Sequence, residues 1–167
     1  LPAQGRPYES FPLTCDEPVS HEEAQRPCYY HTYLQLDKVL DANAPRSTAV
    51  TGKLAHEEVL FIYSHQVVEL HLKQILHELD SCLDLFSLEY VPEESLLTAV
   101  RRLHRITLIQ NLLTAQFPIL ETLTPAQFLE FRDVLFPASG FQSVQFRLVE
   151  NKLGLDPKLR LRFAKNH

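Results

Sequence analysis

Residues 56–86 read HEEVLFIYSHQVVELHLKQILHELDSCLDLF, and this stretch decides the fold. One series of residues recurs in it at alternating steps of four and three, the spacing of one face of an α-helix. The members of this seam are Phe61, His65, Val68, Leu72, Ile75, Leu79, Cys82 and Phe86. No glycine or proline interrupts the stretch. The pattern predicts one long helix from about His56 to Phe86 that buries the seam.

Further helices are expected downstream. A helix should start near Pro92–Glu94 and should kink or end at Pro118. Its apolar residues include Leu96, Val100, Leu103, Ile106 and Ile109. Thr124-Pro125-Ala126-Gln127 is a helix start, with threonine as cap and glutamine three residues later, and it predicts a short helix to about Leu135. After a turn at 137–140, a last helix is expected from Phe141 to Leu153, with Gly154 as its stop.

The N-terminal part is different, because five prolines between Pro2 and Pro27 exclude a long helix there. Residues 1–28 are therefore expected to form an extended arm, followed by a short helix over Tyr29–Ala42 and a loop through Ala44 to Gly52. The predicted fold class is all-α, a bundle of long helices with an extended proline-rich N-terminal arm. The predicted domains are this arm and a helical domain over 29–167.

Composition limits the partners. The chain of 167 residues has a net charge of −5, and its only basic cluster is Arg101, Arg102 and Arg105, so no nucleic-acid partner is expected. Its apolar runs are too short to span a membrane. Three cysteines without a CxxC pair suit a reducing compartment, so a cytoplasmic location is expected, with Cys82 in the core.

Two side chains are candidates for chemistry. His65 lies in an apolar seam, where an imidazole needs a polar partner; it is either a core histidine bonded to a carbonyl or tyrosine, or it faces a ligand pocket. Arg132 shares a helix face with Phe128 and could hold a carboxylate through two hydrogen bonds, or it pairs with Glu130, Asp133 or Glu150. No metal-binding or nucleotide-binding motif is present.

Four segments together resemble the tryptophan 2,3-dioxygenase family. They are YHTYLQLD at 30–37, HEEVLFIYSHQ at 56–66 with Glu69-Leu70, LETLTP at 120–125, and 128–147, which contains PASGFQSVQFR, with Glu150 beyond. The resemblance covers roughly residues 29 to 154. It implies heme b as cofactor, molecular oxygen as co-substrate, and opening of the indole ring of L-tryptophan to N-formylkynurenine.

The resemblance also implies roles for residues. His65 would be the catalytic residue that accepts a hydrogen bond from the indole N–H, and Arg132 would bind the substrate carboxylate. Phe61 and Phe128 would line the substrate pocket. Tyr30, Tyr33 and Leu34 would close the pocket of a neighbouring subunit in a homotetramer. Phe117, Ser139 and Gly140 would lie at the heme.

No metal ligand is expected in this chain. The axial histidine of the family lies beyond residue 167, so the chain corresponds to the N-terminal half, completed by a C-terminal half or a second chain. The chain also departs from the family pattern at His71 and Pro118. Two alternatives remain open: a heme monooxygenase that hydroxylates a substituted indole or aromatic amino acid, and a non-catalytic subunit of a heme protein assembly.

Overall fold

The structure, a computed structural model, describes residues 28–160, and this range contains helices and turns but no strand. The prediction of an all-α fold is confirmed. Contacts within the chain divide it into two units, Leu1–Ala42 and Asn43–His167. The predicted extended arm lies, apart from Cys28, outside the described residues, and the domain boundary after residue 28 stays a prediction.

In the first unit, the prediction of one helix over Tyr29–Ala42 is wrong. The segment forms two short helices, α2 (Tyr30–Tyr33) and α3 (Leu36–Leu40). Between them Gln35 adopts a left-handed conformation with φ of 48°, which a right-handed helix cannot continue through. The Gln35 side chain accepts a hydrogen bond from Lys38 Nζ at 2.9 Å.

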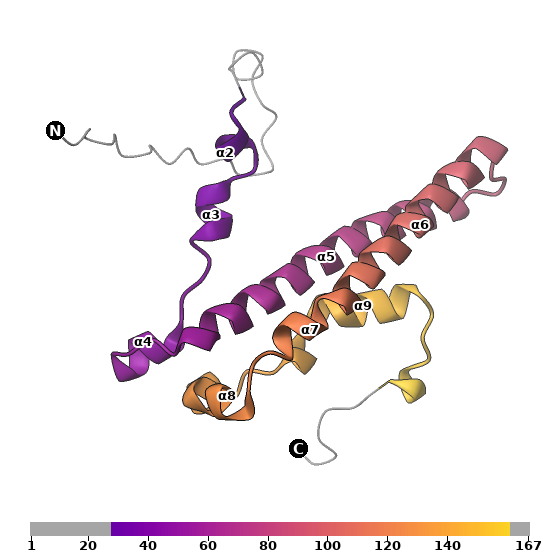
Figure 1. The fold of residues 1–167 in the computed structure, drawn as a ribbon. Coiled ribbons are helices and arrows are strands. Elements are labelled where there is room, and N and C mark those ends of the chain that lie inside the picture. Colours follow the sequence, from indigo (N-terminus) through magenta and orange to yellow (C-terminus); the bar gives the residue numbers. More distant parts are fainter. Residues whose placement is uncertain (1–27, 161–167) are drawn as a thin grey trace. The chain divides into compact units, whose positions relative to one another are not determined.

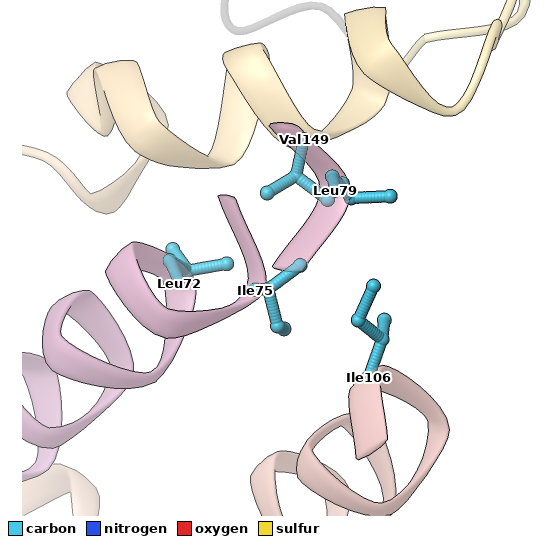
Figure 2. Packing of buried hydrophobic residues seen from close by; sticks show 5 residues of the cluster. All are labelled: Leu72, Ile75, Leu79, Ile106 and Val149. Carbon is cyan, nitrogen blue, oxygen red and sulfur yellow. The ribbon is translucent and has the colours of Figure 1, made fainter. Parts of the chain in front are cut away.

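The second unit is built on α5 (His56–Phe86), whose 31 residues match the predicted helix. Helix α6 (Glu93–Ala115) runs back along α5, and α9 (Val144–Lys152) also packs on α5 (Figure 1). The core lies where the three helices meet, as Figure 2 shows: it contains Leu72, Ile75 and Leu79 from α5, Ile106 from α6 and Val149 from α9. Burial of each such aliphatic side chain contributes about 1.5–3 kcal/mol.

The predicted seam of α5 is buried in its middle and open towards its ends. Leu72, Ile75, Leu79 and Cys82 are buried. Phe61, His65 and Val68 are half-buried. Phe86 is 49% exposed, so the seam does not extend to the last residue of the helix.

The predicted apolar face of α6 is partly wrong. Ile106 is buried and Ile109 packs against the core, but Leu96, Val100 and Leu103 are exposed. The buried position in the first half of α6 is Ala99, whose carbonyl lies 3.8 Å from Cys82 Sγ. The small side chain of Ala99 lets the backbones of α5 and α6 approach each other. This close approach determines which face of α6 is buried, and apolar periodicity alone does not predict that face.

The helix starts and ends from the end of α6 onwards lie close to the predicted positions. Helix α6 ends at Ala115, and α7 (Phe117–Leu120) carries Pro118 in its first turn. Thr124 forms a capping box with Gln127 at the start of α8 (Pro125–Arg132), which continues into the 3-10 turn η1 (Asp133–Leu135). Gly154, with φ of 75°, follows the end of α9. The remaining 3-10 turns are η2 (Gly140–Gln142) and η3 (Pro157–Leu159).

Two predicted boundaries need correction. The last helix starts at Val144 rather than Phe141, because the Ser143 hydroxyl caps it by accepting from Phe146 N–H at 3.1 Å. The predicted loop between Ala44 and Gly52 contains a helix, α4 (Arg46–Thr51). None of the helices in the described range has the length and apolar character needed to cross a membrane.

A buried carboxylate joins α5 to α6. Glu78, 3% exposed, accepts hydrogen bonds from Arg105 Nη1 at 2.6 Å and from Gln74 Nε2 at 2.7 Å. Burial of Glu78 raises its pKa, but the hydrogen bonds from Arg105 and Gln74 outweigh burial, so the pKa lies below its ordinary value of 4.5. The ionised form of Glu78 therefore stabilises the hairpin of α5 and α6.

We predict that Glu78→Gln lowers the free energy of unfolding at pH 7 by about 1–3 kcal/mol, the range for a hydrogen bond to a charged group. A carboxylate with a depressed folded-state pKa stabilises above its unfolded pKa and stops doing so as the pH falls through the folded pKa. The difference between Glu78→Gln and the parent should therefore shrink below pH 4.5. Urea unfolding across this range measures it, with Asp84→Asn on the same helix as control. A difference independent of pH would contradict the ionic role.

Candidate functional site

A cavity of about 610 Å³ lies between α5, α8 and the segment that follows α8. Its volume falls within the range of pockets for small organic ligands. The α5 residues that line it are Phe61, Ile62, His65, Gln66 and Glu69, and those of α8 and η1 are Phe128, Arg132 and Leu135. The remaining wall consists of Ala138, Ser139, Gly140, Gln142 and Ser143.

An aromatic cluster forms the junction between α5 and α8. The Phe61 ring lies 5.7 Å from the Phe128 ring and 5.6 Å from the Phe131 ring, measured between centroids. The Phe128 and Phe131 rings meet edge to face at 5.4 Å. Phe131 is only 1% exposed, so it anchors α8 while Phe128 lines the cavity.

The imidazole of His65 has a defined orientation. Its Nδ1 lies 2.7 Å from the carbonyl oxygen of Phe61, and its ring is tilted by 41° to the Phe61 ring, with the two centroids 4.3 Å apart. Because a carbonyl can only accept, Nδ1 carries the hydrogen and donates. In the neutral ring Nε2 is then left with a free lone pair. The His65 side chain thus bonds to a carbonyl, as one interpretation predicted, and it also lines the cavity, while a role towards a ligand stays a prediction.

The guanidinium of Arg132 lines the same cavity. Within residues 28–160 it forms no ion pair with Glu130, Asp133 or Glu150, and Glu150 is paired instead with Arg147 at 2.6 Å. A half-buried guanidinium without a protein carboxylate is suited to an anion from outside these residues. The candidate ion pairs within the chain are therefore not formed.

The segment after α8 closes the cavity with backbone and small side chains. The Ser139 hydroxyl accepts from Phe141 N–H at 3.3 Å, and Ser139 N–H donates to Gln142 Oε1 at 3.1 Å. Gly140 does not have a positive φ, and a Cβ added to it would meet no atom within 4 Å. Neither backbone strain nor packing therefore explains this glycine.

Six of the predicted site residues thus line one cavity: Phe61, His65, Phe128, Arg132, Ser139 and Gly140. Phe117 is not among the lining residues; it starts α7 and is 56% exposed. Tyr30 and Tyr33 belong to α2 and Leu34 follows it, so all three lie in the first unit. The roles of all these residues stay predictions.

Sequence reasoning did not identify several lining residues. Glu69 lies one turn beyond His65, and its carboxylate accepts from Gln145 Nε2 at 2.7 Å, which ties α9 to the cavity wall. The signal was available, because Glu69 follows His65 by one helical turn on α5. Across the described range, no group of three or more His, Cys, Asp or Glu side chains could hold a metal ion.

These features define a class of protein: an all-helical protein with an aromatic cavity that is also lined by one oriented histidine and one arginine. Comparison with known proteins narrows this class. A family model described as tryptophan 2,3-dioxygenase matches residues 14–167. The chain therefore belongs to the tryptophan 2,3-dioxygenase family.

Individual relatives agree with this assignment. The chain is 53% identical over 139 residues to a tryptophan 2,3-dioxygenase of Alteromonas mediterranea, covering 83% of this chain and 38% of that protein. It is 49% identical over 149 residues to one of Dictyostelium discoideum, covering 89% of this chain and 37% of the relative. For one of Anopheles gambiae the identity is 52%, covering 83% of this chain and 35% of the relative. The chain thus spans little more than a third of the length of these relatives.

We predict that Phe131→Ala destabilises the protein by about 3–5 kcal/mol, because it leaves a cavity at the buried junction of α5 and α8. Leu129→Ala serves as control, since Leu129 lies on the same helix but is 67% exposed. Chemical denaturation followed by circular dichroism measures both variants. Equal, small losses would show that the aromatic cluster does not hold α8.

Proposed function

We propose that the protein that carries this chain is a heme-dependent dioxygenase that opens the indole ring of L-tryptophan to N-formylkynurenine. The observation that carries the proposal is the convergence of His65 and Arg132 on one aromatic cavity. Membership of the tryptophan 2,3-dioxygenase family supports it. The family assignment concerns the chain, and the activity is proposed for the whole protein.

Recognition of tryptophan needs one contact at each end of the substrate. Arg132 is proposed to bind the α-carboxylate through two parallel hydrogen bonds, which its lack of a carboxylate partner within residues 28–160 leaves available. The rings of Phe61 and Phe128 would lie against the indole. Beside the apolar walls of the cavity this charge pair would be stronger than in bulk water, and it would therefore orient the substrate.

At the other end, His65 is proposed to accept the indole N–H. Its Nδ1–H is engaged by the Phe61 carbonyl at 2.7 Å, so the lone pair of Nε2 is the available acceptor. The hydrogen bond would fix the rotation of the indole ring in the cavity. His65 would thereby orient the reacting C2–C3 bond and hold the indole proton.

The cavity residues fit a heme group. The open space beside Gly140 suits the edge of a planar ring system, and Ser139 offers a hydroxyl there, while Phe61 and Phe128 stay assigned to the indole. Heme, when bound, would activate dioxygen, whose two atoms are inserted across the C2–C3 bond. Ser139 and Gly140 would hold it, and Phe117 is proposed to lie near its edge. Since His65 is assigned to the substrate, we propose that another histidine of the whole protein would hold the heme iron.

Assembly is part of the proposal. Tyr30, Tyr33 and Leu34 are proposed to close the pocket of a neighbouring subunit in a homotetramer. Exposure of Tyr30 at 75% and of Tyr33 at 74% supports their availability for such a contact. A cytoplasmic location is proposed from the sparse cysteines, of which Cys28 and Cys82 are free thiols.

Product analysis tests the activity. The heme-loaded protein should convert L-tryptophan under labelled dioxygen into N-formylkynurenine that contains two labelled oxygen atoms. A product with one labelled oxygen would favour the monooxygenase alternative. No turnover in a protein that binds both heme and tryptophan would favour the non-catalytic subunit.

We predict that Arg132→Leu weakens tryptophan binding by about 2–5 kcal/mol, the cost of losing one partner of a buried charge pair. Binding of an indole without a carboxylate should change little. Calorimetric titration of the heme-loaded protein with both ligands measures the difference, and Arg101→Leu, at an exposed position on α6, is the control for loss of charge. Equal losses for the two ligands would remove Arg132 from the carboxylate role.

We also predict that His65→Ala lowers kcat/KM for tryptophan while the heme absorption spectrum is retained. One hydrogen bond to the indole N–H contributes roughly 0.5–1.5 kcal/mol net. His71→Ala is a matched control, because His71 Nδ1 contacts the Val67 carbonyl at 2.9 Å in the same way without lining the cavity. Loss of the heme spectrum in His65→Ala would instead identify His65 as an iron ligand.

A further inference from the structure

Helix α8, which carries Arg132, is tied to the first turn of α5 at its start and to the first residue of α4 past its end. At its start, Gln127 Nε2 donates to Glu57 Oε1 at 3.3 Å. Past its end, the carbonyl of Val134 in η1 accepts from Arg46 Nε at 3.0 Å. Arg46 is in turn attached to α5 through Glu58, the residue next to Glu57.

Glu58 is completely buried. One of its carboxylate oxygens accepts from Arg46 N–H at 2.7 Å, and the other accepts from Ser47 N–H at 2.9 Å. These are the free N–H groups at the start of α4, where a negative charge is favoured. Ser47 is also buried, and its hydroxyl accepts from Ala55 N–H at 3.0 Å, so the start of α4 is fixed against the start of α5.

The side chain of Arg46 connects the start of α4 to the segment beside the cavity. Its Nε donor reaches Val134, two residues after Arg132 and next to the cavity residue Leu135. Since α8 has only eight residues, its own hydrogen bonds do not hold it rigidly. A tie on each side of Arg132 restricts how far its guanidinium can move relative to His65.

We propose that Glu58 and Arg46 are positioning residues for the Arg132 guanidinium: Glu58 fixes the backbone of Arg46, and Arg46 fixes η1. Neither residue lines the cavity. The inference rests on the proposed role of Arg132 in binding the substrate carboxylate. It assigns a function in substrate recognition to a buried carboxylate that otherwise serves only as a helix cap.

The test uses Arg46→Leu in the full heme-loaded protein, because Arg46 is exposed and its backbone N–H to Glu58 remains in the variant. Loss of one net hydrogen bond corresponds to a change of about 3- to 10-fold. Affinity for tryptophan should fall by about this factor, and affinity for an indole without a carboxylate should change less than about twofold. Arg46→Lys should restore part of the loss, since an ammonium can also donate to the Val134 carbonyl. Lys53→Leu, also exposed and close after α4, is the charge control.

The double variant Arg46→Leu/Arg132→Leu separates positioning from general damage. If Arg46 acts through Arg132, adding Arg46→Leu to Arg132→Leu should weaken tryptophan binding no further. Amide hydrogen exchange should also be faster at Ala138, whose N–H donates to the Leu135 carbonyl at 2.8 Å, in Arg46→Leu than in Lys53→Leu. Glu58→Gln should reproduce the selective loss for tryptophan if the variant folds.

Three results would overturn the inference. Additive losses in the double variant, or equal losses for both ligands in Arg46→Leu, would show that Arg46 does not act through Arg132, while the proposed function would stand. Absence of a carboxylate-specific effect in Arg132→Leu itself would reject the role of Arg132, and the positioning role would fall with it. The single variants therefore distinguish failure of the inference from failure of the proposed function.

Discussion

One face of the straight helix α5 contacts both the aliphatic core and the cavity. The positions of the other helices of the second unit depend on this face. In the C-terminal half of the helix the face is aliphatic, and Leu72, Ile75 and Leu79 pack against α6 and α9. In the N-terminal half the same face carries Phe61 and His65, which meet α8 and the cavity. Because a helix without proline or glycine does not bend sharply, the core fixes where the cavity lies.

The charged side chains near α5 differ in whether they have partners within the fold. Taking a carboxylate out of water is costly unless donors surround it, and the two carboxylates that are buried in the described range, Glu58 and Glu78, have two donors each. Arg132 differs, because within the described range its guanidinium has no acidic partner although it lines the cavity. A ligand carboxylate would complete this site in the way that Arg105 completes the site at Glu78. Glu58 and Glu78 thus have their partners within the fold, whereas Arg132 is proposed to find its partner in the substrate.

Sequence patterns predicted the elements whose cause is local. The period of α5, the Thr124 capping box and the stop at Gly154 each depend on residues within one or two turns, and each is confirmed. The elements that were missed depend on distant contacts. Helix α4 is capped by Glu58, 11 residues after Ser47, and the buried face of α6 is selected by the approach of Ala99 to Cys82. The left-handed conformation of Gln35, which separates α2 from α3, could not be predicted, because no glycine or proline occurs there.

The candidate site shows the same division between local and distant causes. The sequence predicts that Phe128 and Arg132 lie together, because one turn of helix separates them. Their proximity to Phe61 was predicted only from the resemblance to a known family, since Phe61 and Phe128 are 67 residues apart and no local pattern relates them. A helix of eight residues is marginal in water, so α8 takes its position from Phe131, Gln127 and the tie at Val134. The position of Arg132 relative to His65 therefore depends on the contacts that α8 and η1 make with Arg46, Glu57 and Phe61, rather than on α8 alone.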